Sequence, residues 1–195
     1  MNFFTSDVHF NDEPTMINDN LPFKSIKAYD KKTIKTFNKQ AGKNDTIFVI
    51  GDLLDCDNAS CEGWKKAIHY VKKIKAKIVL IMGNNEERIV KYFFDGDFEK
   101  FRQLCLSLGY QDVCFNKTLT VEGQEFYLTH RPIDCKKDRM NLFGHTHRAG
   151  GLYRDYGFNV SFDVNHFKLY NEKDIKFLLY LRESNWADSK DLKVF

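Results

Sequence analysis

Short apolar runs that stop abruptly at polar residues alternate with longer amphipathic stretches through the first half of the sequence, and this alternation constrains the fold most. The apolar runs have the length and composition of buried strands. The stretches between them repeat apolar residues at helical spacing. Strand alternating with helix predicts parallel strands joined by right-handed crossovers. The predicted strands cover residues 2–6, 46–50 and 77–82, and the predicted helices cover 24–41, 62–75 and 98–108.

From about residue 112 the pattern changes, because strand candidates follow one another closely. They cover residues 112–115, 118–121 and 125–129, with a hairpin turn predicted at Glu122-Gly123-Gln124. A strand at 140–143 and a helix at 173–182 follow. Two β-sheets flanked by helices accommodate both halves, so the predicted class is α/β, or α+β by some schemes. Because 195 residues suit one sizeable core, we expect a single domain over residues 1–195.

The composition excludes several classes of protein. Hydrophobic residues make up 43% and charged residues 29% of the chain, which excludes a disordered chain. The 30 basic and 27 acidic residues leave a net charge of +3, too balanced for a general nucleic-acid binder. We interpret the lysines of residues 62–75 as a solvated helix surface. The five cysteines are typical of reduced thiols, and no signal peptide or membrane-spanning run is evident, so we expect a cytoplasmic protein.

Potential metal ligands follow nearly every predicted strand. In an open α/β sheet, ligands bind beyond the carboxyl ends of the strands. A single Asp at such a place is ordinarily a turn residue or a helix cap, but the convergence of seven donors on five strand ends favours a metal site. Carboxylate, imidazole and amide oxygen together suit divalent Mn, Fe, Ni, Co or Zn. The donors are Asp7, His9, Asp52, Asn84, His130, His145 and His147.

Two pairs of these donors are separated by a single residue. Alternation along an extended segment would point Asp7 and His9 to the same side of the chain, and His145 and His147 likewise. Each pair is therefore expected to hold one ion.

Five motifs in this order and spacing resemble those of the calcineurin-like metallophosphoesterases. They are DVH at residues 7–9, GD at 51–52, GNNE at 83–86, THRP at 129–132 and GHTH at 144–147. The resemblance covers about residues 1–163, and NVSFDV at 159–164 is similar to the closing segment of small bacterial and phage members. It implies a four-layer αββα sandwich of two mixed β-sheets flanked by helices, which residues 164–195 complete. It also implies a dinuclear metal site at one end.

The resemblance assigns roles to individual residues. By that match Asp7, His9 and His147 would bind the first metal ion, Asn84, His130 and His145 the second, and Asp52 would bridge the two. Manganese is the favoured metal, and the implied reaction is hydrolysis of a phosphate ester by a metal-activated hydroxide. The expected catalytic residues are Asp52, Asn84, Asn85, His130 and Arg131. Arg131 or Arg88 would stabilise charge on the phosphate, although Arg131 is equally suited to a structural ion pair with a loop carboxylate.

The third motif departs from the family pattern. Most members read GNH followed by an acid, and that histidine protonates the leaving group. Asn85 stands in its place, and an amide cannot supply a proton. Several small prokaryotic relatives that also lack this histidine act as phosphodiesterases, so the resemblance favours a diester such as a small or cyclic nucleotide. His166, His69, Asp55 or a residue of 11–23 are candidates for a substitute acid.

Two other functions stay open. One is a nuclease acting on the ends of DNA or RNA, although the modest net charge does not favour an extended nucleic acid. The other is a catalytically weak interaction module on the same fold, which would use surface aromatics among Tyr153, Tyr156 and Phe158. Residues 11–23 and 55–63 are expected to be loops at the rim of the site. Together with residues 134–139 they are expected to select the substrate.

Overall fold

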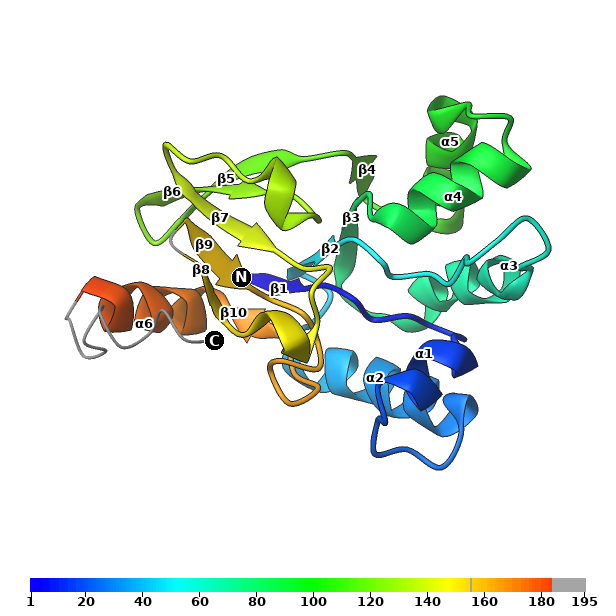
Figure 1. Ribbon diagram of the computed structural model, residues 1–195, viewed down its shortest axis with the longest axis horizontal. Coiled ribbons are helices and arrows are strands. Elements are labelled where there is room, and N and C mark those ends of the chain that lie inside the picture. The colour runs from blue at the N-terminus through cyan, green and yellow to red at the C-terminus, as the bar shows by residue number, and fades with distance from the viewer. Residues whose placement is uncertain (155, 184–195) are drawn as a thin grey trace.

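Two five-stranded sheets form the centre of the protein in a computed structural model that describes residues 1–154 and 156–183 (Figure 1). The first sheet has the order β10-β1-β2-β3-β4 and the second the order β5-β6-β7-β9-β8. In the first, β1 (Asn2–Thr5), β2 (Thr46–Ile50), β3 (Lys77–Ile81) and β4 (Asp112–Cys114) are parallel, and β10 (Tyr170–Asn171) runs antiparallel to β1. The parallel strands confirm the crossovers predicted from the strand-helix alternation.

The second sheet is mixed. It contains β5 (Lys117–Val121), β6 (Gln124–Leu128), β7 (Met140–Phe143), β8 (Tyr153–Arg154) and β9 (Gly157–Asn159). The pairs β5–β6 and β8–β9 are antiparallel, whereas β6–β7 and β7–β9 are parallel. The predicted hairpin turn connects β5 to β6.

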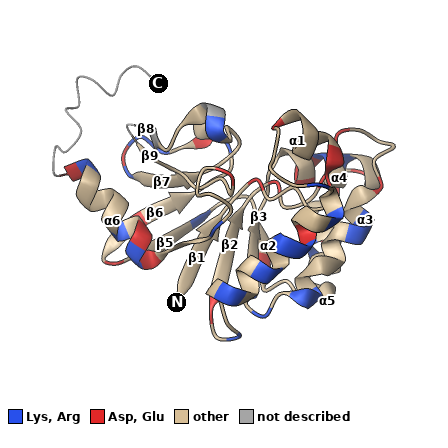
Figure 2. Ribbon diagram, turned by 90° about the horizontal axis from the view of Figure 1, so that it is seen from below, with Lys and Arg blue, Asp and Glu red and all other residues tan. Residues whose placement is uncertain are grey.

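Helices cover the outer face of each sheet. The first sheet is covered by α1 (Glu13–Asn18), α2 (Ile26–Gln40), α3 (Gly63–Ala67), α4 (Asn84–Phe93) and α5 (Phe98–Leu108). The helix α6 (Glu172–Glu183) lies at the opposite end of the molecule (Figure 1). Lys and Arg gather on the outward surface of α2, α3 and α5 (Figure 2). The predicted class, a sandwich of two mixed sheets flanked by helices, is confirmed. Within the described residues, no helix has both the length and the apolar composition to cross a membrane.

Two hydrophobic cores hold these layers together. Phe10, Phe37 and Phe101 are fully buried in the core between the first sheet and its helices. Phe4 and Phe126 are fully buried in the core between the two sheets. Because the central strands are buried on both faces, their sequences read as continuous apolar runs.

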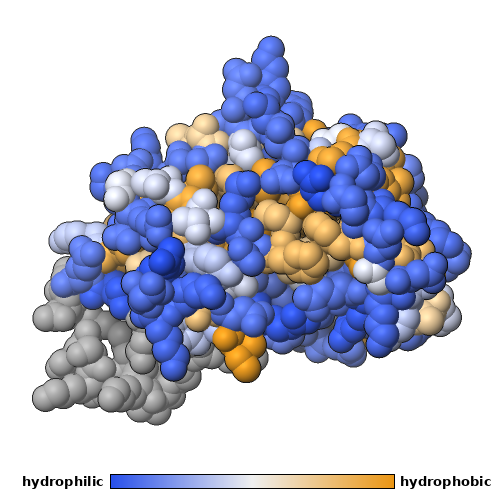
Figure 3. Space-filling view, turned by 90° about the horizontal axis from the view of Figure 1, so that it is seen from above, coloured by the Kyte–Doolittle hydropathy of each residue, from blue (hydrophilic) through white to orange (hydrophobic). Residues whose placement is uncertain are grey.

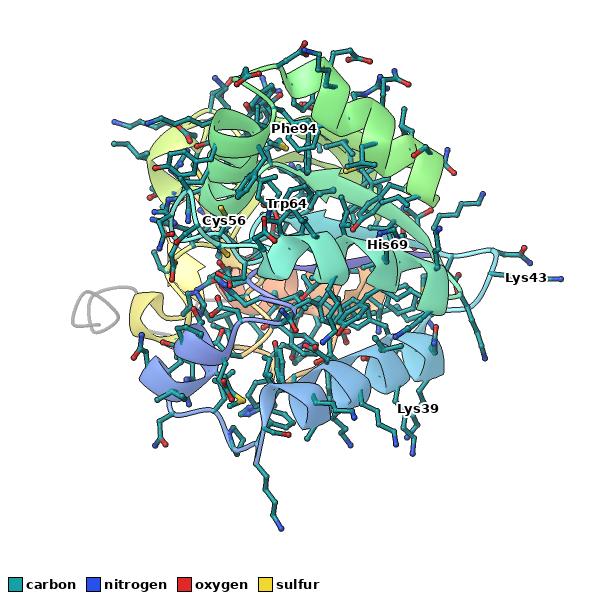
Figure 4. All side chains as sticks on the ribbon, turned by 90° about the vertical axis from the view of Figure 1, so that its right-hand side faces the viewer. Lys39, Lys43, Cys56, Trp64, His69 and Phe94 are labelled. Atoms are coloured by element: carbon teal, nitrogen blue, oxygen red, sulfur yellow. The ribbon has the colours of Figure 1, made fainter. Side chains whose placement is uncertain are left out.

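Aromatic side chains pack inward on the helical side of the molecule. Trp64 of α3 and Phe94 after α4 approach each other, with ring centroids 5.8 Å apart, while Lys39 and Lys43 extend outward (Figure 4). His69 is exposed, as expected for the surface of this helical segment. The lysine-rich helical segment therefore contributes to the core through its apolar side alone.

Several local predictions are wrong. The segment 11–23, expected to be a loop, contains α1, which Asp12 caps by accepting a hydrogen bond from Thr15 N and which Pro14 helps to start. The helix α4 was not expected. The predicted helix 62–75 changes after α3 into the 3₁₀ helix η1 (Ile68–Lys73).

The expected surface aromatics are not a surface group. Phe158 is fully buried because β9 lies between β7 and β8 in the second sheet. Tyr156 is half-buried, and the side chain of Tyr153 lies outside the described part of the chain. The aromatic surface on which the interaction-module alternative relied is therefore not supported.

Candidate metal centre

Polar side chains from separate loops gather in two groups at the carboxyl ends of the strands. The first ligand group is Asp7, His9 and His147, and the second ligand group is Asp52, His130 and His145. Within each group, one donor atom from each residue lies within 4.8 Å of the others. Each group also contains a pair of neighbouring imidazole rings. The ring centroids of His9 and His147 are 5.2 Å apart, and those of His130 and His145 are 5.1 Å apart.

The two histidines of the GHTH motif belong to different groups, so the expectation that His145 and His147 share one ion is wrong. That expectation assumed an extended backbone. His145 has φ 70° and His147 has φ 45°, so the alternation of a strand does not apply. Asp7 and His9 do fall in one group, as expected.

The carboxylate of Asp7 is held by hydrogen bonds to both of its oxygens. Asp7 Oδ2 accepts hydrogen bonds from the hydroxyls of Ser6 at 2.5 Å and Ser161 at 2.7 Å, while Asp7 Oδ1 lies 3.7 Å from His147 Nε2. Asp7 Oδ1 also accepts a hydrogen bond from His145 N at 3.1 Å, so this oxygen lies between residues of both ligand groups.

The two oxygens of Asp52 have different surroundings. Its Oδ1 accepts a hydrogen bond from Asn85 N at 2.9 Å. Its Oδ2 lies 3.9 Å from His9 Nε2 and 3.5 Å from His130 Nε2. One oxygen of Asp52 therefore lies between the two ligand groups.

The histidine rings are oriented through their Nδ1 atoms. His9 Nδ1 donates to Asp12 Oδ2 at 2.9 Å, and His130 Nδ1 donates to the Ile50 carbonyl at 2.8 Å. His147 Nδ1 lies 3.2 Å from Asp19 Oδ2. The Nε2 atoms are thereby turned toward the carboxylates. Metal-binding histidines in proteins are held in this way.

One of these Nε2 atoms gives a direct test of whether the residues fit a metal ion. His9 Nε2 is buried and has no hydrogen-bond partner in the described part of the chain. Buried polar atoms are normally paired, so an unpaired one requires an explanation. A divalent cation bonded to this nitrogen satisfies it, and neighbouring carboxylate oxygens complete a suitable donor set. The first group therefore fits a metal ion, and the second group offers the same kinds of donor.

Asn84 and Glu86 connect the second ligand group to the start of α4. Asn84 Oδ1 lies 3.1 Å from His130 Nε2, so its amide oxygen faces the second group. The fully buried carboxylate of Glu86 accepts hydrogen bonds from the backbone N–H groups of Asp52, Leu53, Leu54 and Gly83, at 2.9 to 3.0 Å. Glu86 therefore holds the loop after β2 against the helix that presents Asn84.

The electrostatics of the site favour positive charge. Burial opposes a charge on His9, but its hydrogen bond to Asp12 and the charge of Asp52 outweigh burial and raise its pKa to about 9. Burial is likewise outweighed by Asp52 at His130, whose pKa rises to about 9. Although burial opposes ionisation of Asp52, the charges of His130 and His9 lower its pKa. Carboxylates that hold protons on neighbouring rings also attract metal cations to this place.

The backbone of the site is strained. A positive φ is uncommon outside glycine and costs conformational energy. Residue Gly51 has φ 84°, and a Cβ there would overlap the His130 ring, while a Cβ at Gly83 would overlap Asp52. The non-glycine ligands in this conformation are Asp7 (φ 53°), His9 (φ 49°), Asp52 (φ 50°), His145 (φ 70°) and His147 (φ 45°).

Asn85 and Arg131, predicted to be catalytic, both have partners within the protein. Asn85 is 3% exposed, and its amide donates to the Leu54 carbonyl at 3.1 Å and accepts from Arg88 Nη1 at 2.9 Å. Arg131 makes a two-pronged ion pair with Glu87, at 3.0 and 2.5 Å. The partner carboxylate therefore belongs to α4 and not to a loop.

The candidates for a substitute acid differ in their surroundings. His69 and His166 are exposed, and neither belongs to a ligand group. Asp55 is 8% exposed, its Oδ1 lacks a partner in the described part of the chain, and burial with the nearby Asp12 charge raises its pKa to about 6. The raised pKa would let Asp55 carry a proton closer to neutral pH than an ordinary aspartate does.

Sequence reasoning missed the residues that support the ligands. Asp12 and Asp19 flank α1, and Asp12 contacts the nearby His9, whereas Asp19 and Ser161 reach ligands that are distant in sequence. Asp12 had a local signal, because an Asp shortly before Pro is typical of a helix start. Ser161 had none.

Comparison with known proteins gives matches along most of the chain. The family model described as calcineurin-like phosphoesterase matches residues 3–180. An uncharacterized protein of Methanocaldococcus jannaschii is 28% identical over 177 residues, which cover 85% of this chain and 84% of that protein. A protein of unknown function from Aquifex aeolicus has a similar structure, with a TM-score of 0.64 and 20% identity over 91% of this chain and 98% of that one. This last match shows a shared fold.

Proposed function

This chain belongs to the calcineurin-like phosphoesterase family, and on that premise we propose that it is a phosphodiesterase with two metal ions that hydrolyses small nucleotide diesters, cyclic nucleotides included. The observation that carries the proposal is the position of Asp52 Oδ2, between His9 Nε2 at 3.9 Å and His130 Nε2 at 3.5 Å. An oxygen placed there is shared by the two ligand groups.

The proposed ligands follow from that position. Asp7, His9 and His147 would hold one ion, and Asn84, His130 and His145 would hold the other, with Asp52 available to both. Two bound divalent ions, for which we propose manganese, would supply a hydroxide near neutral pH and offset negative charge on the phosphate.

The protein's own residues position the substrate and the ligands. We propose that the Arg131 guanidinium, oriented by Glu87, and the Asn84 amide contact phosphate oxygens. Asn85 holds the loop after β2 through Leu54 O and has no proton to give the leaving group. Esters with good leaving groups suffer least from a missing acid, so activated diesters should be hydrolysed faster than nucleotide diesters, whose leaving groups are sugar hydroxyls.

Metal content and turnover test this proposal together. Purified protein incubated with manganese and then desalted should contain two ions per chain, and it should hydrolyse bis-p-nitrophenyl phosphate. Two bound ions without hydrolysis would instead favour an interaction module. Protein that binds no metal would refute the assignment of both ligand groups.

A second candidate function, a nuclease, is favoured by one observation. A surface hollow of about 530 Å³ lies between α2 and the segment of α3 and η1, and its charged lining residues are Lys27, Lys31, Lys66, Lys73 and the single acid Asp30. Such a cluster suits a polyanion. Cleavage of DNA or RNA ends with a steep salt dependence would support the nuclease, whereas salt-insensitive hydrolysis of small nucleotides would support the phosphodiesterase.

We further propose one domain over residues 1–195 and a cytoplasmic location. The location is supported by five cysteines that are all free thiols, since disulfides are rare in reducing compartments.

A further inference from the structure

A cavity of about 440 Å³ opens beside the second ligand group, where the second sheet faces α4. Its volume lies in the range of small-molecule sites, roughly 300 to 1,000 Å³. His130 and Arg131 form part of its lining, so the cavity is continuous with the candidate metal centre. A phosphoester bound at these two residues would extend its organic part into the cavity.

One wall of the cavity is aromatic and unusually exposed. Phe115 is 51% exposed and lines the cavity, while its ring packs against Phe98 with centroids 4.6 Å apart. Ile133, another lining residue, is 88% exposed. The face seen from above, on the side of β5, β6 and α5, has a hollow of apolar residues within a hydrophilic surround (Figure 3). Exposed apolar groups gathered beside a catalytic centre indicate a ligand surface.

The remaining walls offer hydrogen-bonding groups. Asn116 is exposed and lines the cavity, so its amide presents both a donor and an acceptor. Lys136 Nζ lies 5.4 Å from the centroid of the Tyr127 ring, and both residues line the cavity. A purely aliphatic group would leave these polar atoms unused.

The wall that contains Lys136 is held rigidly. Asn141 of β7 is fully buried, and its amide accepts from Lys136 N and donates to the carbonyls of Lys136 and Arg139, each at 2.8 Å. The segment therefore keeps its shape without a ligand, which lowers the cost of binding one.

We propose that this cavity binds the nucleobase of the substrate, with the base stacked on Phe115 and the phosphate at His130 and Arg131. The inference rests on the proposed phosphodiesterase function and deepens it by naming where the base of the nucleotide binds. A planar heteroaromatic ring matches an aromatic wall bordered by an amide and an ammonium group. The packing of Phe115 on Phe98 supports the ring in a fixed position, as a stacking platform requires.

The experiment compares a ligand that has a base with one that lacks it. Binding of adenosine 5′-monophosphate and ribose 5-phosphate to manganese-loaded protein is measured by calorimetry. The base should improve affinity by about 5- to 100-fold. F115A should remove this advantage and leave ribose 5-phosphate binding unchanged. F177A is the matched control, because Phe177 is 58% exposed and belongs to α6.

Equal affinity of the wild-type protein for the two ligands would overturn the inference, as would an advantage of the base that F115A retains. Hydrolysis of bis-p-nitrophenyl phosphate by the same preparations separates the two proposals. Hydrolysis of the diester together with equal affinity for the two ligands would refute the nucleobase site but not the phosphodiesterase function. A base preference without turnover of any diester refutes the phosphodiesterase, and with it the claim that the bound base belongs to a substrate.

Discussion

The two ligand groups are supported in different ways. In the first group, His9 Nδ1 meets the carboxylate of Asp12 at 2.9 Å and His147 Nδ1 meets that of Asp19 at 3.2 Å. In the second group, His130 Nδ1 donates to a backbone carbonyl, and the adjoining Asn84 is a neutral amide. Carboxylates behind the rings increase the basicity of the ligands. We therefore expect the first group to hold its metal ion more tightly and the second to exchange its ion more readily.

The largest effect is expected from Asp52→Asn, which would remove the charged carboxylate that the two ligand groups share. The variant should lose both ions and nearly all activity, by more than the 10²- to 10³-fold that removal of one transition-state donor costs. Metal analysis and diester turnover measure this. Asp95→Asn is the matched control, because Asp95 has φ 54° like Asp52 at φ 50° but is exposed. A fully active Asp52→Asn enzyme would contradict the shared ligand.

Raising the pH should affect both groups of the metal-free protein. The pKa values of His9 and His130 are about 9 in the folded protein and 6.5 in the unfolded chain. The stabilisation is therefore fully present below pH 6.5 and is lost as the pH rises through 9. The free energy of unfolding should fall by a few kcal/mol, roughly, between these limits. Urea unfolding in chelator measures it, and a stability that does not fall would contradict the protonated rings.

Asp12→Asn should weaken the first group alone. The affinity of the first group for manganese should fall about 10- to 100-fold, because His9 loses its carboxylate partner. The helix cap should survive, since Asn caps as well as Asp. Asp97→Asn is the control, because Asp97 caps α5 by accepting from Lys100 N. Metal titration should show one weakened site. Equal weakening of both sites would contradict the difference between the groups.

The smallest effect is expected from Glu87→Gln, at the edge of the second group. Arg131 would lose its ionic partner, and diester turnover should fall by roughly 2- to 5-fold, in line with the modest worth of a partly exposed pair. The metal content should stay the same. Glu62→Gln provides the control, since Glu62 pairs with Lys65 on the surface. A turnover loss accompanied by metal loss would place Glu87 among the groups that support the ions.

The central strands were predictable because burial on both faces makes them continuous apolar runs. The helix α4 was missed although Ile89 and Val90 are buried at helical positions, because its first turn lies in the GNNE motif, whose residues were assigned to metal binding and catalysis. The helix α1 was missed because it has only 6 residues and one buried side chain, Met16. Short elements with little apolar surface leave little periodicity in a sequence.

The placement of potential ligands at strand ends was also predictable, but their grouping was not. The parallel topology brings β1, β2 and β3 to one edge, so Asp7, Asp52 and Asn84 meet there. The separation of His145 from His147 depends on a left-handed backbone, which Asp and His adopt without a signal in the sequence. Phe158 was misplaced because a three-residue strand shows too little alternation to reveal its buried face.

Because Asp7 and Asp52 adopt a left-handed backbone, one kind of substitution at these positions should leave the fold unchanged. Asn tolerates this backbone as Asp does, whereas a β-branched residue does not. A descendant with Asn at Asp52 would keep its shape while its chemistry disappears. Such a protein would be folded but inactive. Its descendants could evolve a binding function with every intermediate still folded.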